Sequence, residues 1–161
     1  MLLFAACAAL VGHASPALAQ WKAPQWGVTQ AEVLSNSALQ ARKEKDRKDS
    51  RIRNARKLAE GPIVIDGIDF TASYYFGEKA DRLVMINVVP ALSDCPAAIT
   101  SFQAAFGEGS REVKSTVIAE NRPELVQEKI EWRGEGIAGS ITYLGVSFGD
   151  QLAYCQLLHE E

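Results

Sequence analysis

Apolar and polar residues alternate with period two along much of the chain after residue 62. The clearest case runs from residue 68 to residue 76, where one face carries Ile68, Phe70, Ala72, Tyr74 and Phe76. This pattern is typical of a half-buried antiparallel strand. Residues 63–65 precede it across Asp66-Gly67, a dipeptide that favours a tight turn. Residues 83–89 are apolar on both faces apart from Asn87, as expected of a central strand. Further strands are predicted at 113–119, 125–133, 137–148 and 151–158.

Two segments carry the signals of helices instead. Thr29 and Glu32 form a capping box, which predicts that a helix begins at this point. In the second segment, Ser93 or Asp94 is the expected cap and Pro96 occupies the first turn. One face of this second helix is apolar through Ile99, Phe102 and Phe106.

Residues 41–60 are rich in strong helix formers but contain few apolar side chains. The pattern is compatible with a solvated extension of the first helix or with a mobile arm, and both alternatives stay open. Gly61-Pro62 is expected to end the helix.

These elements predict an α+β fold in which helices pack on one face of an antiparallel meander sheet. An arrangement of two tandem α-β-β units is a variant of the same prediction. A chain of 161 residues is long enough for one domain with its own core. The expected organisation is a signal peptide at 1–19, an N-terminal extension at 20–28, a helix with a basic arm at 29–60, and an α+β region at 61–161 that forms one domain with 29–60.

The start of the chain has the pattern of an export signal. Residues 2–11 are apolar, and Ala17-Leu18-Ala19 fits the small-x-small pattern of a cleavage site before Gln20. The apolar run is too short to span a bilayer. We therefore expect export to the periplasm with cleavage after Ala19. The alternative is a lipoprotein anchored at Cys7.

Removal of the signal would leave two cysteines, Cys95 and Cys155. An oxidising compartment favours a disulfide between them, joining the second helix to the last strand. A redox-active pair would need a Cys-x-x-Cys spacing, which the chain lacks.

The net charge of -3 conceals a basic segment. Residues 42–57 contain nine Lys and Arg against three acidic residues. Such a segment is expected to be a solvated face or a surface for an anionic partner in the envelope. No aromatic side chain is interleaved with these charges, so nucleic acid is not the expected partner. The candidate partner contacts are Arg42, Lys43, Arg47, Arg51, Arg53, Arg56, Trp21 and Trp26.

Catalytic patterns are weak. The only histidine after residue 19 is His159, so a Ser–His–Asp or Cys–His site is not expected. We expect no metal and no cofactor. A hydrolase that uses paired carboxylates stays open as an alternative.

The segment Trp26-Gly27-Val28-Thr29-Gln30-Ala31-Glu32-Val33 resembles the W-G-x-T-x-x-E-V opening of uncharacterised periplasmic proteins of Gram-negative bacteria. It is also similar to a segment of the small outer-membrane lipoproteins of β-barrel assembly, and to β-lactamase-inhibitor-like folds. The chain departs from the assembly lipoproteins after Val33, where its basic run begins. The resemblance implies an envelope protein and transfers no site residues.

The functional hypothesis is an exported, non-catalytic binding or accessory protein of the cell envelope that acts through protein–protein contacts. An inhibitor or adaptor of a secreted partner is the first alternative, and the carboxylate hydrolase is the second. Membrane association is expected only through a lipid anchor or the basic arm.

Overall fold

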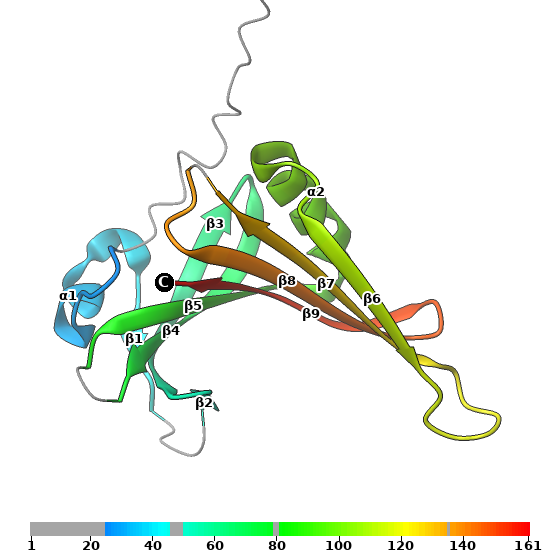
Figure 1. The fold of residues 1–161 in the computed structure, drawn as a ribbon. Helices are drawn as coiled ribbons and strands as arrows, with labels where there is room; N and C mark the ends of the chain where they lie inside the picture. Colours follow the sequence, from blue (N-terminus) through cyan, green and yellow to red (C-terminus); the bar gives the residue numbers. More distant parts are fainter. Residues whose placement is uncertain (1–24, 46–49, 79–80, 135) are drawn as a thin grey trace, which may run out of the picture.

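The computed structural model of this protein describes residues 25–45, 50–78, 81–134 and 136–161. The expected signal peptide at 1–19, its alternative anchor Cys7, the first part of the 20–28 extension, Trp21 and Arg47 lie outside these residues. Within them, strands dominate, and they all belong to one antiparallel sheet (Figure 1).

The sheet runs in the order β1-β3-β4-β5-β9-β8-β7-β6, and β2 pairs with β3 off this path. The strands are β1 (Arg42–Lys43), β2 (Arg51–Ile52), β3 (Ala55–Ile65), β4 (Ile68–Gly77), β5 (Leu83–Pro90), β6 (Ser110–Thr116), β7 (Leu125–Arg133), β8 (Ser140–Phe148) and β9 (Gln151–Glu160). The helices are α1 (Gln30–Ser35) and α2 (Cys95–Phe106), with 3-10 turns η2 (Ser37–Leu39) and η3 (Leu92–Asp94).

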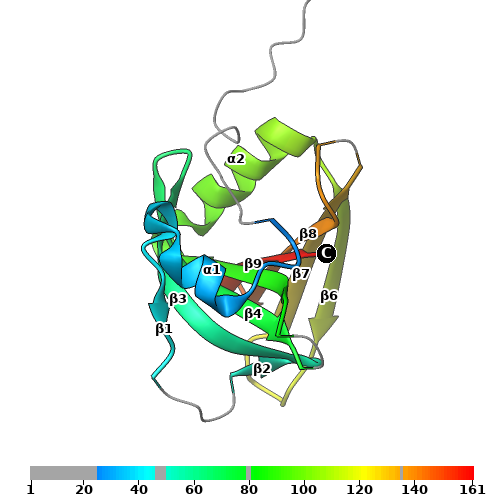
Figure 2. The same cartoon turned by 90° about the vertical axis from the view of Figure 1, so that its left-hand side faces the viewer.

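Helix α2 carries the chain from the middle of the sheet to its far edge. The chain leaves β5, passes through α2 and enters β6 at the edge, and the β6–β9 meander then returns to pair with β5. The sheet curves around α2, which lies against its inner face (Figure 2). Only four residue pairs join β5 to β9, from Met85↔Glu160 to Val88↔Leu157.

The predicted α+β fold is wrong, and so is its variant of two tandem α-β-β units. Over the described residues, the protein is a largely β fold with one extended sheet and a single helix of more than two turns. The error lies in residues 41–60, where the helix formers suggested an extension of the first helix. Helix α1 ends at Ser35, and this segment contributes β1, β2 and the first half of β3.

Gly61 and Pro62 do not end a helix but lie inside β3. A Cβ on Gly61 would come within 2.9 Å of backbone atoms of residues 39–41, so only glycine allows η2 and β3 to approach this closely. Pro62 is exposed in a strand near the edge, where a missing N–H costs least. Here tertiary contacts override the local helix signals of the flanking residues.

Most of the other sequence predictions of individual elements are confirmed. The strand expected at 113–119 instead runs from Ser110 to Thr116, and the one expected at 137–148 begins at Ser140. The hairpin turns at Asp66-Gly67, with Ile65 opposite Ile68. The Thr29–Glu32 capping box begins α1, with both reciprocal bonds present. Asp94 occupies the N-cap position of α2, although its side chain makes no capping bond.

The main core lies between α2 and the inner face of the sheet. Phe102 of α2 packs against Trp132 of β7, with ring centroids 5.9 Å apart. Both side chains are almost fully buried, together with Tyr74 and Tyr143 from β4 and β8. A smaller cluster lies on the outer face, formed by Ala55, Tyr75, Met85 and Leu158.

A disulfide joins Cys95, the first residue of α2, to Cys155 in β9, as the sequence predicted. The bond closes a loop with a sequence separation of 60 residues, and both side chains are buried. It ties the crossover helix to the strand beside β5, and so supports the short β5–β9 junction.

We expect Cys95→Ser to lower the free energy of unfolding by about 2–5 kcal/mol, because the unfolded chain loses a long-loop constraint. Thermal and denaturant melts of Cys95→Ser, Cys155→Ser and the double variant measure this. The three losses should be equal, since each variant removes the same bond. Two additive losses would contradict this interpretation.

Candidate functional site

The basic segment is folded into the sheet edge rather than extended as an arm. Arg42 and Lys43 form β1, Arg51 lies in β2, and Arg56 lies in β3. Arg53 occupies the turn between β2 and β3 with a φ of 53°.

Four of the basic side chains in this segment are paired with acidic side chains. Three of these four, all arginines, pair with an acid from a distant part of the chain. Arg51 contacts Glu78 at 2.8 Å, Arg53 contacts Glu160 at 2.6 Å and Arg56 lies 3.8 Å from Asp81. Lys57 lies between two carboxylates, Glu44 and Glu60. These partners neutralise much of the positive charge that the sequence concentrates here. The three exposed arginine pairs add little stability.

Trp26 is held against the body of the protein. Its indole Nε1 donates to the Ala138 carbonyl at 2.9 Å, and its ring meets the edge of His159 with centroids 4.6 Å apart. The Gly27 N–H donates to the Leu83 carbonyl at 3.0 Å, which aligns the segment with β5. In the structure, the Trp26-Gly27 opening therefore anchors the N-terminal segment between β5 and the β7–β8 connection.

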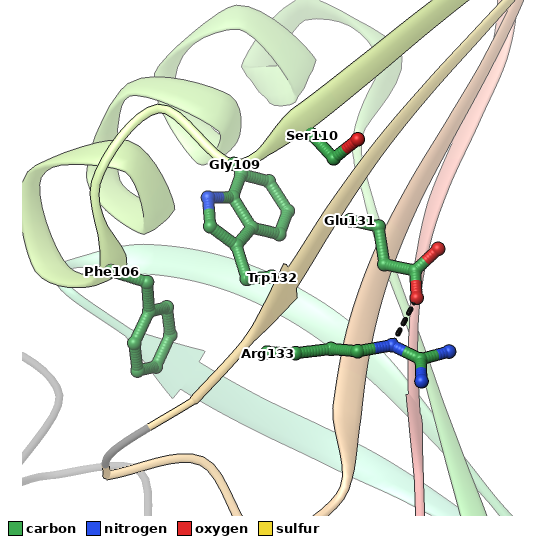
Figure 3. A pocket seen from close by; sticks show the side chains of 6 residues that line it. All are labelled: Phe106, Gly109, Ser110, Glu131, Trp132 and Arg133. Carbon is green, nitrogen blue, oxygen red and sulfur yellow. Dashed lines mark hydrogen bonds and ion pairs between the residues drawn. The ribbon is translucent and has the colours of Figure 1, made fainter.

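A pocket of about 410 Å³ opens beside the end of β7 (Figure 3). Trp132 lines it and donates from Nε1 to the Gly107 carbonyl at 2.8 Å. The Glu131 carboxylate accepts hydrogen bonds from Lys129 and Arg133. These two cations hold the pKa of Glu131 below its usual value, so the group is ionised at neutral pH and unsuited to act as a general acid.

Three acidic residues that each lie close to another acid in the sequence, Asp66, Glu108 and Glu112, are bound to other side chains. Asp66 accepts a hydrogen bond from Ser101 of α2 at 2.8 Å, and Glu108 accepts one from Gln103 at 3.0 Å. Glu112 pairs with Lys114 at 2.9 Å, which lowers the pKa of Glu112. The described ranges contain no cluster of three or more His, Cys, Asp and Glu side chains suited to a metal ion.

A second depression, which we call the outer-face groove, crosses β6 to β9 on the face away from α2. It has a volume of about 340 Å³. Its lining comprises Glu112, Lys114, Gln127, Glu128, Lys129, Leu144, Gly145, Val146, Tyr154 and Gln156. Leu144, Val146 and Tyr154 supply apolar surface, and charged side chains of β6 and β7 border it. An apolar centre with a polar rim is the usual anatomy of a protein-binding surface.

A hydrogen-bonded group of side chains fixes one end of this groove. The Gln156 Oε1 accepts from the Asn87 Nδ2 at 3.0 Å and also from the Tyr154 hydroxyl. Burial raises the pKa of Tyr154, so its hydroxyl remains a donor at neutral pH. Asn87 is buried in β5, which makes the position of Gln156 depend on the β5–β9 junction.

Large apolar side chains are exposed at the end of the sheet far from α1. We call Val117, Ile118 and Phe148 the hairpin tip; they are 66%, 58% and 45% exposed. The Gly149 N–H donates to the Glu124 carbonyl at 2.8 Å, which brings the β8–β9 turn against the β6–β7 connection. Both connections project from the same end of the molecule (Figure 1).

The exposed apolar residues are distributed unevenly between the two meanders. Of the seven large hydrophobic side chains that are exposed in the described ranges, five belong to the β6–β9 half: Val113, Val117, Ile118, Phe148 and Tyr154. The sequence did not identify these residues as surface residues. It predicted Val117 and Ile118 within a strand at 113–119, whereas they lie in the β6–β7 connection. Only the exposure of Val113 follows from the position of β6 at an edge of the sheet.

Within the described part of the chain, no helix is both long enough and apolar enough to cross a membrane. No protein-family model, curated protein or solved structure matches this chain.

We expect stability to fall on acidification through His159, whose pKa is lowered by burial. Its Nε2 donates to the Ala138 carbonyl at 2.9 Å. This hydrogen bond by itself would raise the pKa, but burial is the larger effect, so the folded state favours the neutral ring and the unfolded state binds a proton more readily. This contribution is present above about pH 6.5 and is lost as the pH falls through the lower folded-state pKa.

Denaturant melts of the native chain and of His159→Gln between about pH 7.5 and pH 5.5 measure this effect. The variant should have a shallower fall in unfolding free energy over that window. Identical pH profiles for the two chains would show that His159 does not contribute.

Proposed function

We propose that this protein is an exported, non-catalytic binding or accessory protein of the cell envelope that acts through protein–protein contacts. The export signal expected at 1–19 and the disulfide support a periplasmic location, because structural disulfides persist in oxidising compartments. The observation that carries the contact function is the gathering of exposed apolar side chains on the β6–β9 half.

The hairpin tip is the proposed centre of the contact. Val117, Ile118 and Phe148 lie on connections and strand ends, so their exposure contributes nothing to the core. Apolar side chains that gather at one end of a sheet mark interaction sites more often than single exposed residues do. The outer-face groove on the same four strands adds apolar and charged contact surface next to the tip.

The other end of the molecule is less suited to this role. Three of its arginines, Arg51, Arg53 and Arg56, are engaged with acidic side chains, and Trp26 packs against His159. An anionic partner would have to displace these carboxylates. The distribution of exposed apolar surface therefore favours a protein partner at the hairpin tip over an anionic component at the basic segment.

We expect the variant Val117→Ser/Ile118→Ser/Phe148→Ser to fold normally and to bind its envelope partner at least about tenfold more weakly, because buried apolar anchors dominate binding energy. A photo-crosslinking residue at position 148 should capture that partner in cells. Binding of the purified partner to the native chain and the variant is then measured by calorimetry.

The matched control is Val64→Ser, which removes a side chain of similar exposure, 56%, from β3. It should leave binding unchanged. The comparison variant is Arg51→Ser/Arg53→Ser/Arg56→Ser. If this variant abolished binding while the hairpin-tip variant bound normally, the contact would belong to the basic segment and the proposal would be wrong.

A further inference from the structure

Strand β6 forms a free edge of the sheet. It has one strand neighbour in the described ranges, β7, and all seven of its residues are exposed. Figure 1 shows β6 at the edge of the sheet, so the backbone groups that point away from β7 face solvent. At the other end of the sheet, the short strands β1 and β2 lie along β3. An edge of this length is a template for pairing with another strand.

The residue order in β6 makes the strand complementary to itself. Consider two antiparallel copies related by a twofold axis perpendicular to the sheet, which keeps both outer faces on the same side. In an antiparallel pair, directly opposite residues project from the same face of the sheet, and successive residues alternate between faces. The axis must therefore lie midway between the two copies of one residue, and not between two successive residues. With the axis at Val113, Glu112 of each copy lies opposite Lys114 of the other, and all seven residues are paired.

The neighbouring registers are less favourable. An axis at Arg111, Glu112 or Lys114 would place that charged residue directly opposite itself, which is destabilising. An axis at Ser115 avoids this repulsion but pairs only three residues of the strand. Charge and overlap therefore select one register.

We propose that the free edge of β6 binds β6 of a second copy of this chain, antiparallel and centred on Val113, to form one continuous sheet. Val113, which is 55% exposed, meets its counterpart at the axis on the inner face. Glu112 and Lys114 meet theirs on the outer face, where both residues also line the outer-face groove. The two grooves consequently join across the axis. This interface is independent of the contact with a different protein at the hairpin tip.

The geometry also indicates the strength of this association. A contact made by one strand per copy buries little area, so it falls among the weak interfaces. Self-association is therefore expected at concentrations of roughly 0.1–1 mM of the purified chain. Analytical ultracentrifugation over that range should show a monomer–dimer equilibrium. A chain that stays monomeric at about 1 mM overturns the proposal.

Charge reversal tests the selected register. Glu112→Lys places lysine opposite lysine, and Lys114→Glu places glutamate opposite glutamate, so each variant should weaken the dimer about tenfold or more. The double variant Glu112→Lys/Lys114→Glu restores opposite charges and should dimerise like the native chain. A mixture of the two single variants should form a heterodimer. Arg133→Glu, a charge reversal on β7 outside the paired region, is the control and should leave association unchanged.

Cysteine crosslinking tests the same register without altering these charges. Val113→Cys should oxidise to a covalent dimer, because its counterpart lies directly opposite. Arg111→Cys and Ser115→Cys should each fail to crosslink alone and should crosslink when mixed. Circular dichroism confirms that each variant is folded. Equal crosslinking at all three positions, or single charge reversals that dimerise normally, would refute this interface.

Discussion

The packing of α2 against the inner face of the sheet holds the two halves of this protein together. Among the described strands, the β3–β5 and β6–β9 meanders pair with each other only along the short β5–β9 junction. Helix α2 crosses this junction and inserts Phe102 beside Trp132, while the Cys95–Cys155 bond ties its first residue to β9. The helix and the disulfide therefore stabilise a curved sheet whose two halves would be held together only weakly by strand pairing alone.

The curvature around α2 separates the surface into regions with different chemistry. The inner face is covered by the helix and contains the large aromatic residues. The outer face carries a small buried apolar cluster around Tyr75 and Met85, and its groove over β6 to β9 combines Leu144, Val146 and Tyr154 with charged and amide side chains. Because the helix covers one face only, the outer face and the β6 edge remain accessible to partners.

The two ends of the sheet also differ. At the β1–β3 end, basic side chains form ion pairs with acids from elsewhere in the chain. The Trp26 ring packs against the ring of His159. At the β6–β9 end, Val117, Ile118 and Phe148 remain exposed. This asymmetry supports contact functions at the second end, since exposed apolar surface gains most from being removed from water.

Sequence reasoning by itself determined the features that depend on local chemistry. The β3–β4 hairpin, the meander after residue 125, the capping box at Thr29 and the extent of α2 follow from periodicity, turn residues and caps. The disulfide followed from counting cysteines. Tertiary structure alone decided that residues 55–60 form part of β3, because pairing with β4 outweighs their helix propensity. It alone placed β6 at an edge and paired the arginines, since strand order and long-range ion pairs depend on contacts between residues far apart in the chain.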